Sequence, residues 1–169
     1  MRLTGERVAL RPLSAGDLDD VLAAIRDPGV ASWWVTTGDE AVREELLATP
    51  GTTAFAIEVG GAVAGMVMCS EVLDPDYRSA GIDIFLADAF QGRGYGPEAI
   101  RVLARHLFAS GHHRLTIDPA VANARAIRAY EKVGFKRVGV MREYERGPDG
   151  AWRDGLLMDL LARELEQGN

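Results

Sequence analysis

The six residues QGRGYG (91–96) place three glycines and one arginine between a β-rich segment and a segment with helical periodicity. Glycine loses more backbone freedom on folding than any other residue, so this density is unfavourable unless the fold requires bare backbone there. A glycine-rich turn between a strand and a helix gathers unpaired backbone N–H groups at the positive end of the helix dipole. The hexapeptide therefore predicts either an anion site, with phosphate as the simplest ligand, or a tight β–α turn without a ligand.

Two common phosphate-binding loops do not fit this hexapeptide. A P-loop ends in Gly-Lys-Ser/Thr, whereas Gly96 is followed by Pro97 and Glu98. The dinucleotide-binding fingerprint needs a third glycine three residues after the second, and Pro97 stands at that position after Gly94. Pro97 has no N–H donor, but its fixed φ suits the first turn of a helix. A phosphate held here would need a loop of another kind.

Hydrophobic periodicity divides the rest of the chain into strands and helices. Two β-rich runs separated by Gly60–Gly61 predict a hairpin. The expected strands are 7–13, 53–59, 62–72, 81–87, 113–120, 136–145 and 151–161; the expected helices are 14–27, 39–49, a segment that includes 100–108, and 123–135; breaks are expected at 28–34 and 74–80. The order βααββ, βαβα, ββ predicts a mixed α/β domain with a parallel strand pair at its centre.

Length and composition are those of one globular domain covering residues 1–169. Hydrophobic residues make up 47% and charged residues 26%, and no apolar run approaches the length of a membrane span. The single cysteine, Cys69, excludes an internal disulfide, and it follows the apolar run VAGMVM, so we expect it to be a buried hydrophobic residue. We expect a cytoplasmic protein without a membrane partner, either a monomer or a homodimer.

The chain is acidic, with a net charge of −6 and a pI of about 5.1. Such a surface disfavours nucleic acid and favours a positively charged small molecule as partner. Solubility alone is the simpler explanation of the same net charge. The three histidines, His106, His112 and His113, lack the spacing of metal ligands, so no metal is expected.

Gln91, Gly94 and Gly96 have the spacing Gln-x-x-Gly-x-Gly after a short strand, and this stretch resembles motif A of the GNAT superfamily of acetyl-CoA-dependent N-acetyltransferases. The resemblance implies acetyl-CoA as co-substrate, with its pyrophosphate held by backbone N–H groups of the loop and with added charge from Arg93. The implied loop contacts are Gln91, Gly92, Arg93, Gly94, Tyr95 and Gly96.

The segment GIDIFLA (81–87) carries the resemblance further, because it is similar to the family's strand that splays from its parallel neighbour. A gap beside a splayed strand leaves backbone groups with which the pantetheine arm can pair like an added strand. The resemblance implies that the backbone of Ile84, Phe85 and Leu86 lies nearest the thioester.

The segment NARAIRAYEKVGF (123–135) is similar to the family's second motif. The resemblance implies that Asn123 contacts the cofactor arm and that Tyr130 protonates the departing thiolate. The implied architecture is the GNAT fold of the α/β (α+β) class. It has a mixed, mostly antiparallel sheet with a splayed central parallel strand pair, flanked by helices.

Acetyl transfer to an amine needs a base, because an alkylamine is protonated at neutral pH, and it needs a donor for the thioester oxygen, which a strand N–H near Phe85 or Leu86 can supply. Asp83 is the best placed base: it lies on the splayed strand, opposite to the apolar side chains, in an element where aspartate is rare. The alternative interpretation of Asp83 is a strand residue that faces solvent and has no catalytic role. Asp118 closes a strand at its carboxyl end, where ligand sites of α/β proteins lie, although Asp-Pro also forms plain turns.

From about Val8 to Gly139 the chain resembles the aminoglycoside 6'-N-acetyltransferases of bacterial antibiotic resistance, on the stretches LRPLSAGDLDDVLAAIRDPGVASWW, DPDYRSAGIDIFLA and TIDPAVANARAIRAYEKVGFKRVG. In that family, carboxylates bind the ammonium groups of the drug. The resemblance implies that Asp83 is the general base, directly or through a water molecule, and that Asp118 binds the substrate. Asp149 in GPDG matches a third carboxylate, although Asp-Gly is equally a hairpin turn.

One stretch departs from that family. Its members carry a further aspartate and a tryptophan pair on the strand before DP, where this chain has GMVMCSEVL with Glu71 as the charged residue. We therefore take Glu71 as a candidate substrate contact. Trp33 and Trp34 match a WW pair near the family's N-terminus, which makes Trp34 another candidate, and packing under the first helix is expected for at least one of the two.

The acceptor and the activity each have an alternative. A protein N-terminus, a polyamine or a siderophore precursor is an alternative acceptor, because those branches of the superfamily also begin with LRPL…D and share YEKVGF. A non-catalytic acyl-CoA sensor is an alternative to an enzyme, against which the pair Tyr130 and Asp83 argues. The sequence thus predicts an N-acetyltransferase for a small cationic amine, with the 6'-amine of an aminoglycoside as the first candidate.

Overall fold

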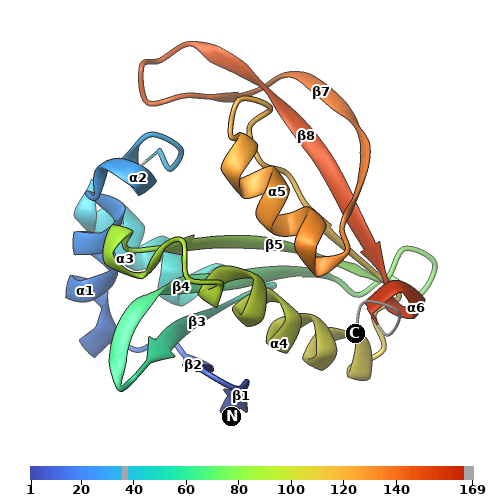
Figure 1. The fold of residues 1–169 in the computed structure, drawn as a ribbon, viewed down its shortest axis with the longest axis horizontal. Helices are drawn as coiled ribbons and strands as arrows, with labels where there is room; N and C mark the ends of the chain where they lie inside the picture. The colour runs from blue at the N-terminus through green and yellow to red at the C-terminus, as the bar shows by residue number, and fades with distance from the viewer. Residues whose placement is uncertain (36–37, 166–169) are drawn as a thin grey trace.

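The computed structural model describes residues 1–35 and 38–165, in which a curved sheet carries helices on its faces (Figure 1). The strands are β1 (Leu3–Thr4), β2 (Val8–Pro12), β3 (Thr52–Val59), β4 (Ala62–Val72), β5 (Ser79–Leu86), β6 (Arg114–Ile117), β7 (Lys136–Arg146) and β8 (Trp152–Leu161). The helices are η1 (Ala15–Asp17), α1 (Leu18–Ile25), α2 (Pro28–Ala31), α3 (Asp39–Ala48), η2 (Asp88–Phe90), α4 (Tyr95–Ala109), α5 (Ala124–Val133) and α6 (Ala162–Leu165). Within the described residues, no helix is both long enough and apolar enough to cross a membrane.

The described strands pair in the order β1-β2-β3-β4-β5-β6-β8-β7. Neighbours are antiparallel except β5 and β6, which are parallel. The predicted hairpin around Gly60–Gly61 is confirmed as β3 and β4, and both glycines have a positive φ, 57° and 87°, as this type of turn requires. The predicted fold class, a mixed and mostly antiparallel sheet with a parallel pair near its centre, is therefore confirmed.

β5 and β6 separate after a short paired stretch. Their pairing ends at Gly81 and Thr116, although β5 continues to Leu86. β6 stops at Ile117, before an Asp-Pro step whose proline has no N–H to continue the ladder. The splay expected for 81–87 is confirmed, and in the described part of the chain no strand pairs with this edge of β5 beyond Gly81.

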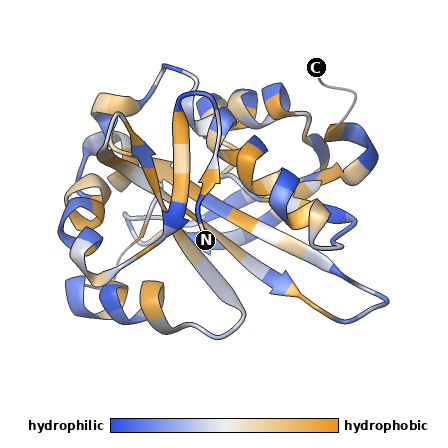
Figure 2. Cartoon of the chain, turned by 90° about the horizontal axis from the view of Figure 1, so that it is seen from below, coloured by the Kyte–Doolittle hydropathy of each residue, from blue (hydrophilic) through white to orange (hydrophobic). Residues whose placement is uncertain are grey.

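Alternate side chains of β5 pack into two different hydrophobic layers. Ile82 and Leu86 lie in the layer covered by α4, together with Leu103 of that helix, whereas Phe85 lies in the layer that contains α1. Cys69 is buried in the first layer, as predicted. Figure 2 shows hydrophobic residues along the central strands, with hydrophilic and hydrophobic residues mixed along the helices that cover them. β5 is thus held on both faces while its edge toward β6 stays open.

Most predicted boundaries differ from the observed ones by one or two residues, the strand predicted over 113–120 already ends at Ile117, and two segments differ in kind. The helix predicted over 14–27 is a 3-10 turn followed by α1, because Asp17 turns back and accepts hydrogen bonds from Ser14 N and Oγ at 2.9 and 2.7 Å. The break predicted over 28–34 contains the short helix α2, in which Pro28 takes a first-turn position. The short elements β1 and α6 carry no periodicity that the sequence pattern could reveal.

Candidate functional site

A cleft of about 610 Å³ lies beside the end of β5, between α2, the start of α4, and α5. The predicted residues that line it are Trp34, Ile84, Phe85, Leu86, Gln91, Gly92, Gly94, Tyr95, Gly96, Asn123 and Tyr130. Arg93 belongs to the same loop but is not among the lining residues. Folding therefore joins the three segments that the sequence pattern marked separately, namely 81–87, 91–96 and 123–135.

The glycine loop requires glycine for both its backbone and its packing. Gly92 and Gly94 have positive φ values of 74° and 83°, which side chains rarely allow. A Cβ on Gly94 would lie 3.2 Å from Nη2 of Arg7, and one on Gly92 would lie 3.3 Å from Nη2 of Arg125. Gly94 is the residue before α4, so the positive end of that helix dipole lies at the cleft. The loop thus has the conformation and the field of an anion site.

Gln91 ties this loop to two other elements. Its Nε2 donates to the carbonyl of Leu86, at the end of β5, at 2.8 Å. Its Oε1 accepts from Nη1 of Arg125, at the start of α5, at 3.0 Å. The side chain of Gln91 therefore fixes the loop relative to the splayed strand and to α5.

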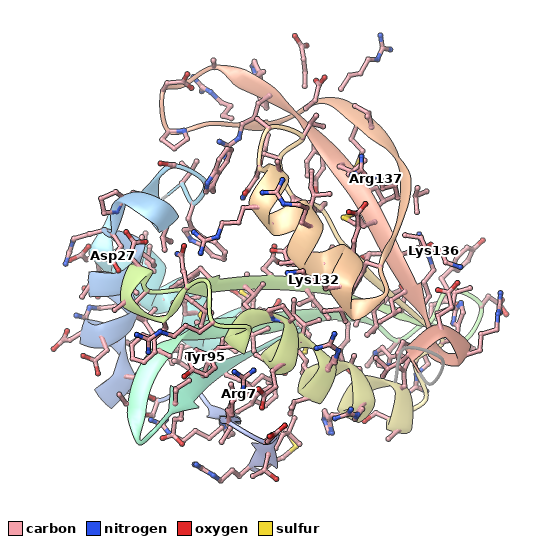
Figure 3. All side chains as sticks on the ribbon, in the orientation of Figure 1. Arg7, Asp27, Tyr95, Lys132, Lys136 and Arg137 are labelled. Atoms are coloured by element: carbon pink, nitrogen blue, oxygen red, sulfur yellow. The ribbon has the colours of Figure 1, made fainter. Side chains whose placement is uncertain are left out.

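Arg7 supports the loop from the side away from the cleft. Its Nη1 donates to the carbonyl of Arg93 at 2.9 Å, and its guanidinium lies 5.1 Å from the centre of the Tyr95 ring. Its Nε pairs with Oε2 of Glu98 at 2.9 Å. Figure 3 shows Arg7 beside Tyr95, below the start of α4. Arg7 does not line the cleft. Because the Arg93 carbonyl accepts from Arg7, this carbonyl points toward Arg7 and not into the cleft.

Three cations on one wall of the cleft were missed by sequence reasoning. Arg125, Arg128 and Lys132 all line the cleft from α5 and are exposed (Figure 3 labels Lys132). Their spacing of three and four residues places them on one helix face, which could have been read from NARAIRAYEK. In a chain with a net charge of −6, this wall favours a polyanion.

The opposite wall is apolar where β5 ends. The Trp34 ring packs edge-on against Phe85, with 4.9 Å between ring centres. Behind it, β4 approaches so closely that a Cβ on Gly65 would lie 2.2 Å from the carbonyl oxygen of Phe85. Trp34 therefore packs on the core, as expected for at least one of the two tryptophans, and it also lines the cleft; its role as a substrate contact stays a prediction.

A polar cluster lies beside the Tyr130 end of the cleft. Burial, and after it the negative charges of Asp83 and Asp118, raises the pKa of the Tyr130 phenol well above its usual value. Burial also raises the pKa of Asp118. The structure therefore brings Asp83 of β5, Asp118 after β6 and Tyr130 of α5 close enough to interact electrostatically.

Tyr144 of β7 completes this cluster, although it was not a candidate from the sequence. Its hydroxyl donates to Oδ2 of Asp118 at 2.7 Å, and this hydrogen bond raises the pKa of Tyr144 to about 12. The negative charge of Asp83 acts on Tyr144 in the same direction. No sequence signal marked Tyr144, because its partner is 26 residues away along the chain.

Two predicted substrate contacts lie elsewhere. Met68 of β4 pairs with Asp83, and Glu71, three residues further along β4, points to the opposite face of the sheet. There its Oε1 is 3.1 Å from Nε2 of buried His112. Asp149 lies in the turn between β7 and β8, where its Oδ1 accepts from the N–H of Ala151 at 3.0 Å. The structure brings neither residue into the cluster of Asp83.

Asn123, a predicted cofactor contact, also has a structural task. Its Oδ1 accepts from the N–H of Ala126 at 3.2 Å and caps the start of α5. Because Asn123 lines the cleft, this cap also sets how the first turn of α5 faces the ligand space.

The site as a whole has two chemically different ends. The end formed by the glycine loop and α5 presents a helix dipole and cations, which suit phosphate groups. Tyr130 lines the opposite end, and the carboxylates of Asp83 and Asp118, which are not among the lining residues, act on its phenol from beside the cleft. Their negative charges suit an ammonium group. The end of β5, where none of the described strands continues the pairing with β6, lies between the two ends. Among the described side chains, no group of three or more metal-ligating residues is placed to hold a metal ion.

Comparison with known proteins identifies relatives of this chain among acetyltransferases. Residues 7–136 match the family model described as an acetyltransferase (GNAT) domain. The chain is 31% identical to aminoglycoside N(6')-acetyltransferase type 1 of Klebsiella pneumoniae over 170 residues, which is 87% of this chain and 81% of that relative.

Two solved structures with bound cofactor are similar over nearly their whole length. RimJ of Mycobacterium smegmatis in complex with CoA-disulfide has 26% identity and a TM-score of 0.86, covering 98% of this chain and 89% of that one. The aminoglycoside acetyltransferase AAC(6')-Ib in complex with coenzyme A has 27% identity and a TM-score of 0.77, covering 95% of this chain and 98% of that one.

Proposed function

Because the chain belongs to the GNAT acetyltransferase family and uses acetyl-CoA to acetylate an amine, we propose that its acceptor carries several ammonium groups and that the 6'-amine of an aminoglycoside is acetylated. The observation that carries this proposal is that the negative charges of Asp83 and Asp118 both act on Tyr130, which lines the cleft. The 31% identity to an aminoglycoside N(6')-acetyltransferase over most of the chain supports it.

The cluster has the charge that a multiply protonated amine requires. Two carboxylates act on the same half-buried phenol, so the potential there is negative. An ammonium ion placed beside them is stabilised in its charged form, which binds the acceptor but does not react. One carboxylate must therefore accept a proton before the amine can attack, and we assign this task to Asp83, directly or through a water molecule.

Tyr130 is proposed as the proton donor to the leaving thiolate. A phenol is protonated at neutral pH, so the donor is present, and the raised pKa means that Tyr130 gives up its proton only as negative charge develops on the sulfur. Its side chain lines the cleft, and the charges of Asp83 and Asp118 act on it; both observations support this assignment. The N–H groups near Phe85 and Leu86 are proposed to stabilise the thioester oxygen.

The other cleft residues are proposed to hold acetyl-CoA, which supplies the acetyl thioester when bound. Backbone N–H groups of the loop from Gln91 to Gly96 are suited to the pyrophosphate, since the α4 dipole ends there. The open edge of β5 at Ile84–Leu86 is suited to pair with the pantetheine arm. Arg125 and Arg128 add positive charge to this end.

An acceptor panel tests the proposal. Thiol release from acetyl-CoA is followed with kanamycin, tobramycin, spermidine and a short peptide, each over a range of concentrations. We expect saturable turnover with the two aminoglycosides and acetylation at the 6'-amine, identified by mass spectrometry of the product. Turnover with the peptide alone would exclude the aminoglycoside assignment. If no amine raises thiol release above background, the acceptor proposal is wrong as a whole.

A further inference from the structure

Tyr144 owes its position to an irregular segment of β7. Pairing between β7 and β8 passes from Met141–Gly155 directly to Glu145–Arg153, so three residues of β7 lie opposite one residue of β8. Within this bulge Glu143 has a positive φ of 49°, and its N–H donates to Oδ1 of Asp154 at 2.8 Å. A strained residue tied to the facing strand indicates that the bulge is a defined structure.

Gly155 of β8 is the point where Tyr144 and the segment after Asp118 meet. A Cβ on Gly155 would lie 2.7 Å from Cδ1 of Tyr144, so the glycine makes room for the ring. On its other side Gly155 forms a bridge with Ala120, two residues after Asp118. The N–H of Leu156 donates to the carbonyl of Pro119 at 2.8 Å. The same stretch of β8 therefore anchors both partners of the Tyr144–Asp118 hydrogen bond.

The hydrogen bond has a direct effect on the charge of Asp118. Burial opposes ionisation of this carboxyl group, and the Tyr144 hydroxyl acts against burial by stabilising the carboxylate. Asp83 on β5 and Glu145 on β7 also act on Tyr144. Tyr130 on α5 faces the pair as well, and the charge of Asp118 raises its pKa. Of these groups, the Tyr144 hydroxyl is the one that donates to Asp118 through a side-chain hydrogen bond.

We propose that Tyr144 is a positioning residue: its hydroxyl fixes the Asp118 carboxylate so that it binds a second ammonium group of the acceptor. The inference rests on the proposed function, because it assigns the multiply charged acceptor to a particular contact. In this arrangement Asp83 accepts a proton from the amine that is acetylated, whereas Asp118, held by Tyr144, binds an ammonium group that is not acetylated. Loss of the hydroxyl then weakens binding of multiply charged acceptors and leaves the chemical step intact.

The test compares two acceptors and two tyrosine variants. Kanamycin carries several amines, whereas 6-amino-6-deoxyglucose presents a comparable primary amine on one sugar without the others. We expect Tyr144→Phe to raise KM for kanamycin about tenfold, with kcat changed less than twofold and KM for 6-amino-6-deoxyglucose and acetyl-CoA unchanged. The matched control is Tyr77→Phe, because Tyr77 is 72% exposed in the turn between β4 and β5. It is expected to change none of these values.

A double variant and a measurement without turnover complete the test. Asp118→Asn should raise KM for kanamycin, and Tyr144→Phe should add nothing further in that background. Additive effects, equal losses for both acceptors, or a loss confined to kcat would each contradict the positioning role. Carbon-13 NMR titration of the Asp118 carboxyl group is independent of the acceptor: its pKa should rise in Tyr144→Phe. If the pKa of Asp118 is unchanged in Tyr144→Phe, this inference is wrong even when the acceptor panel shows turnover with aminoglycosides. If the pKa rises but no acceptor is turned over, the proposed function is wrong and the hydrogen-bond effect on Asp118 stands.

Discussion

At the scale of single residues, the polar cluster depends on which groups share a small volume. Asp83 lies on β5, Asp118 follows β6 and Tyr130 lies on α5, and the charges of the two aspartates raise the pKa of the tyrosine. Asp83 was recognisable in the sequence because a charged residue interrupts an apolar strand. Glu71 was also recognisable as a charge on a strand, but an odd spacing along β4 turns it to the other face of the sheet.

Asp83→Asn tests the base at this scale. The asparagine keeps the size of the side chain but cannot accept a proton, so we expect kcat to fall about 100- to 1,000-fold at pH 7 with little change in KM for acetyl-CoA. Thiol release with a saturating acceptor measures the effect. Glu71→Gln is the matched control, since Glu71 lies on the opposite face of the sheet next to His112. Wild-type turnover in Asp83→Asn would remove Asp83 from the role of base.

At the scale of elements, the cleft is made by two interruptions of regular structure. β6 ends after four residues, so β5 has a free edge, and the loop before α4 passes through left-handed conformations that leave the start of the helix accessible. Gln91 and Arg7 hold the loop in place through side chains. The end of β6 and the loop before α4 lie in different parts of the sequence. The loop is tied to β5 because the Gln91 side chain donates to the carbonyl of Leu86, the last residue of β5.

Gly94→Ala tests the loop. Alanine is disfavoured at a φ of 83° by about 1 kcal/mol, and its Cβ would meet the Arg7 guanidinium. We expect KM for acetyl-CoA to rise about tenfold or more while KM for the acceptor changes little. Gly139→Ala is the control, because a Cβ on Gly139 of β7 has open space around it and the glycine does not have a positive φ. Equal kinetics of the two variants would show that the loop does not bind the co-substrate.

Arg128→Ala tests the cationic wall of α5. If this wall binds the phosphates of acetyl-CoA as proposed, removal of one exposed charge should raise KM for acetyl-CoA about threefold at low salt, and the effect should shrink as ionic strength rises. Arg105→Ala serves as the control, because Arg105 is an exposed arginine of α4 that does not line the cleft. A rise in acceptor KM instead of acetyl-CoA KM would place Arg128 at the other end of the site.

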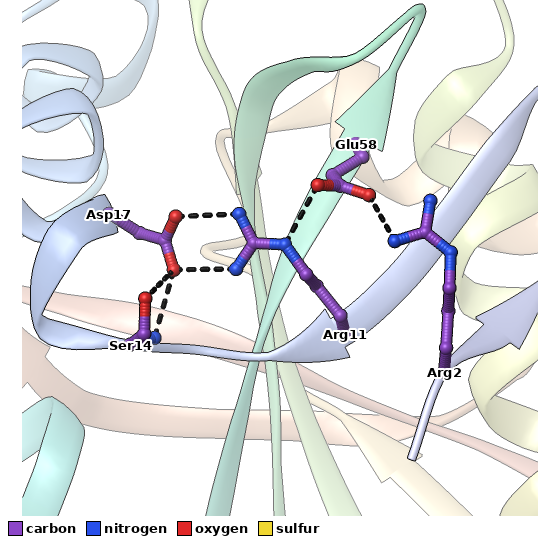
Figure 4. Close-up of polar contacts among 5 residues, drawn as sticks. All are labelled: Arg2, Arg11, Ser14, Asp17 and Glu58. Atoms are coloured by element: carbon purple, nitrogen blue, oxygen red, sulfur yellow. Dashed lines mark hydrogen bonds and ion pairs between the residues drawn. The ribbon is translucent and has the colours of Figure 1, made fainter.

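At the scale of the whole molecule, an ion-pair network fastens the layer that contains η1 and α1 to the sheet (Figure 4). The Arg11 guanidinium bonds to both carboxylate oxygens of Asp17, at 2.6 and 2.7 Å, and to Oε1 of Glu58 at 2.7 Å. Arg2 pairs with the second oxygen of Glu58 at 2.5 Å. Hydrogen bonds from Arg11, and to a lesser extent from Ser14, hold the pKa of buried Asp17 far below its usual value.

Asp17→Asn should therefore lower the free energy of unfolding by about 2 kcal/mol at pH 7. Because the pKa of Asp17 is lowered on folding, its contribution is complete above the unfolded pKa of about 4 and is lost as pH falls below that value. Urea unfolding at pH 7 and at pH 3 should thus show a smaller difference between variant and wild type at pH 3. Asp19→Asn, at a site whose side chain is 89% exposed, is the control. A pH-independent difference would contradict this account.

Sequence alone determined the elements that local rules govern. The hairpin at Gly60–Gly61, the glycine loop before a helix, and the helix after Asn123 each depend on residues within one short segment, and all three are confirmed. The splay of β5 was expected from a family resemblance, and the structure adds its cause in the early end of β6.

Only the tertiary structure decided which side chains face one another across the site. Tyr144 reaches Asp118 because a bulge in β7 and a glycine in β8 bring them together, and Arg7 supports a loop 86 residues away. Periodicity assigns a residue to a face of its own element, but it does not state what packs opposite that face. Local propensity therefore sufficed for the elements and the glycine loop, whereas the cluster of Asp118 and Tyr144 is built from long-range contacts that exist only in the folded chain.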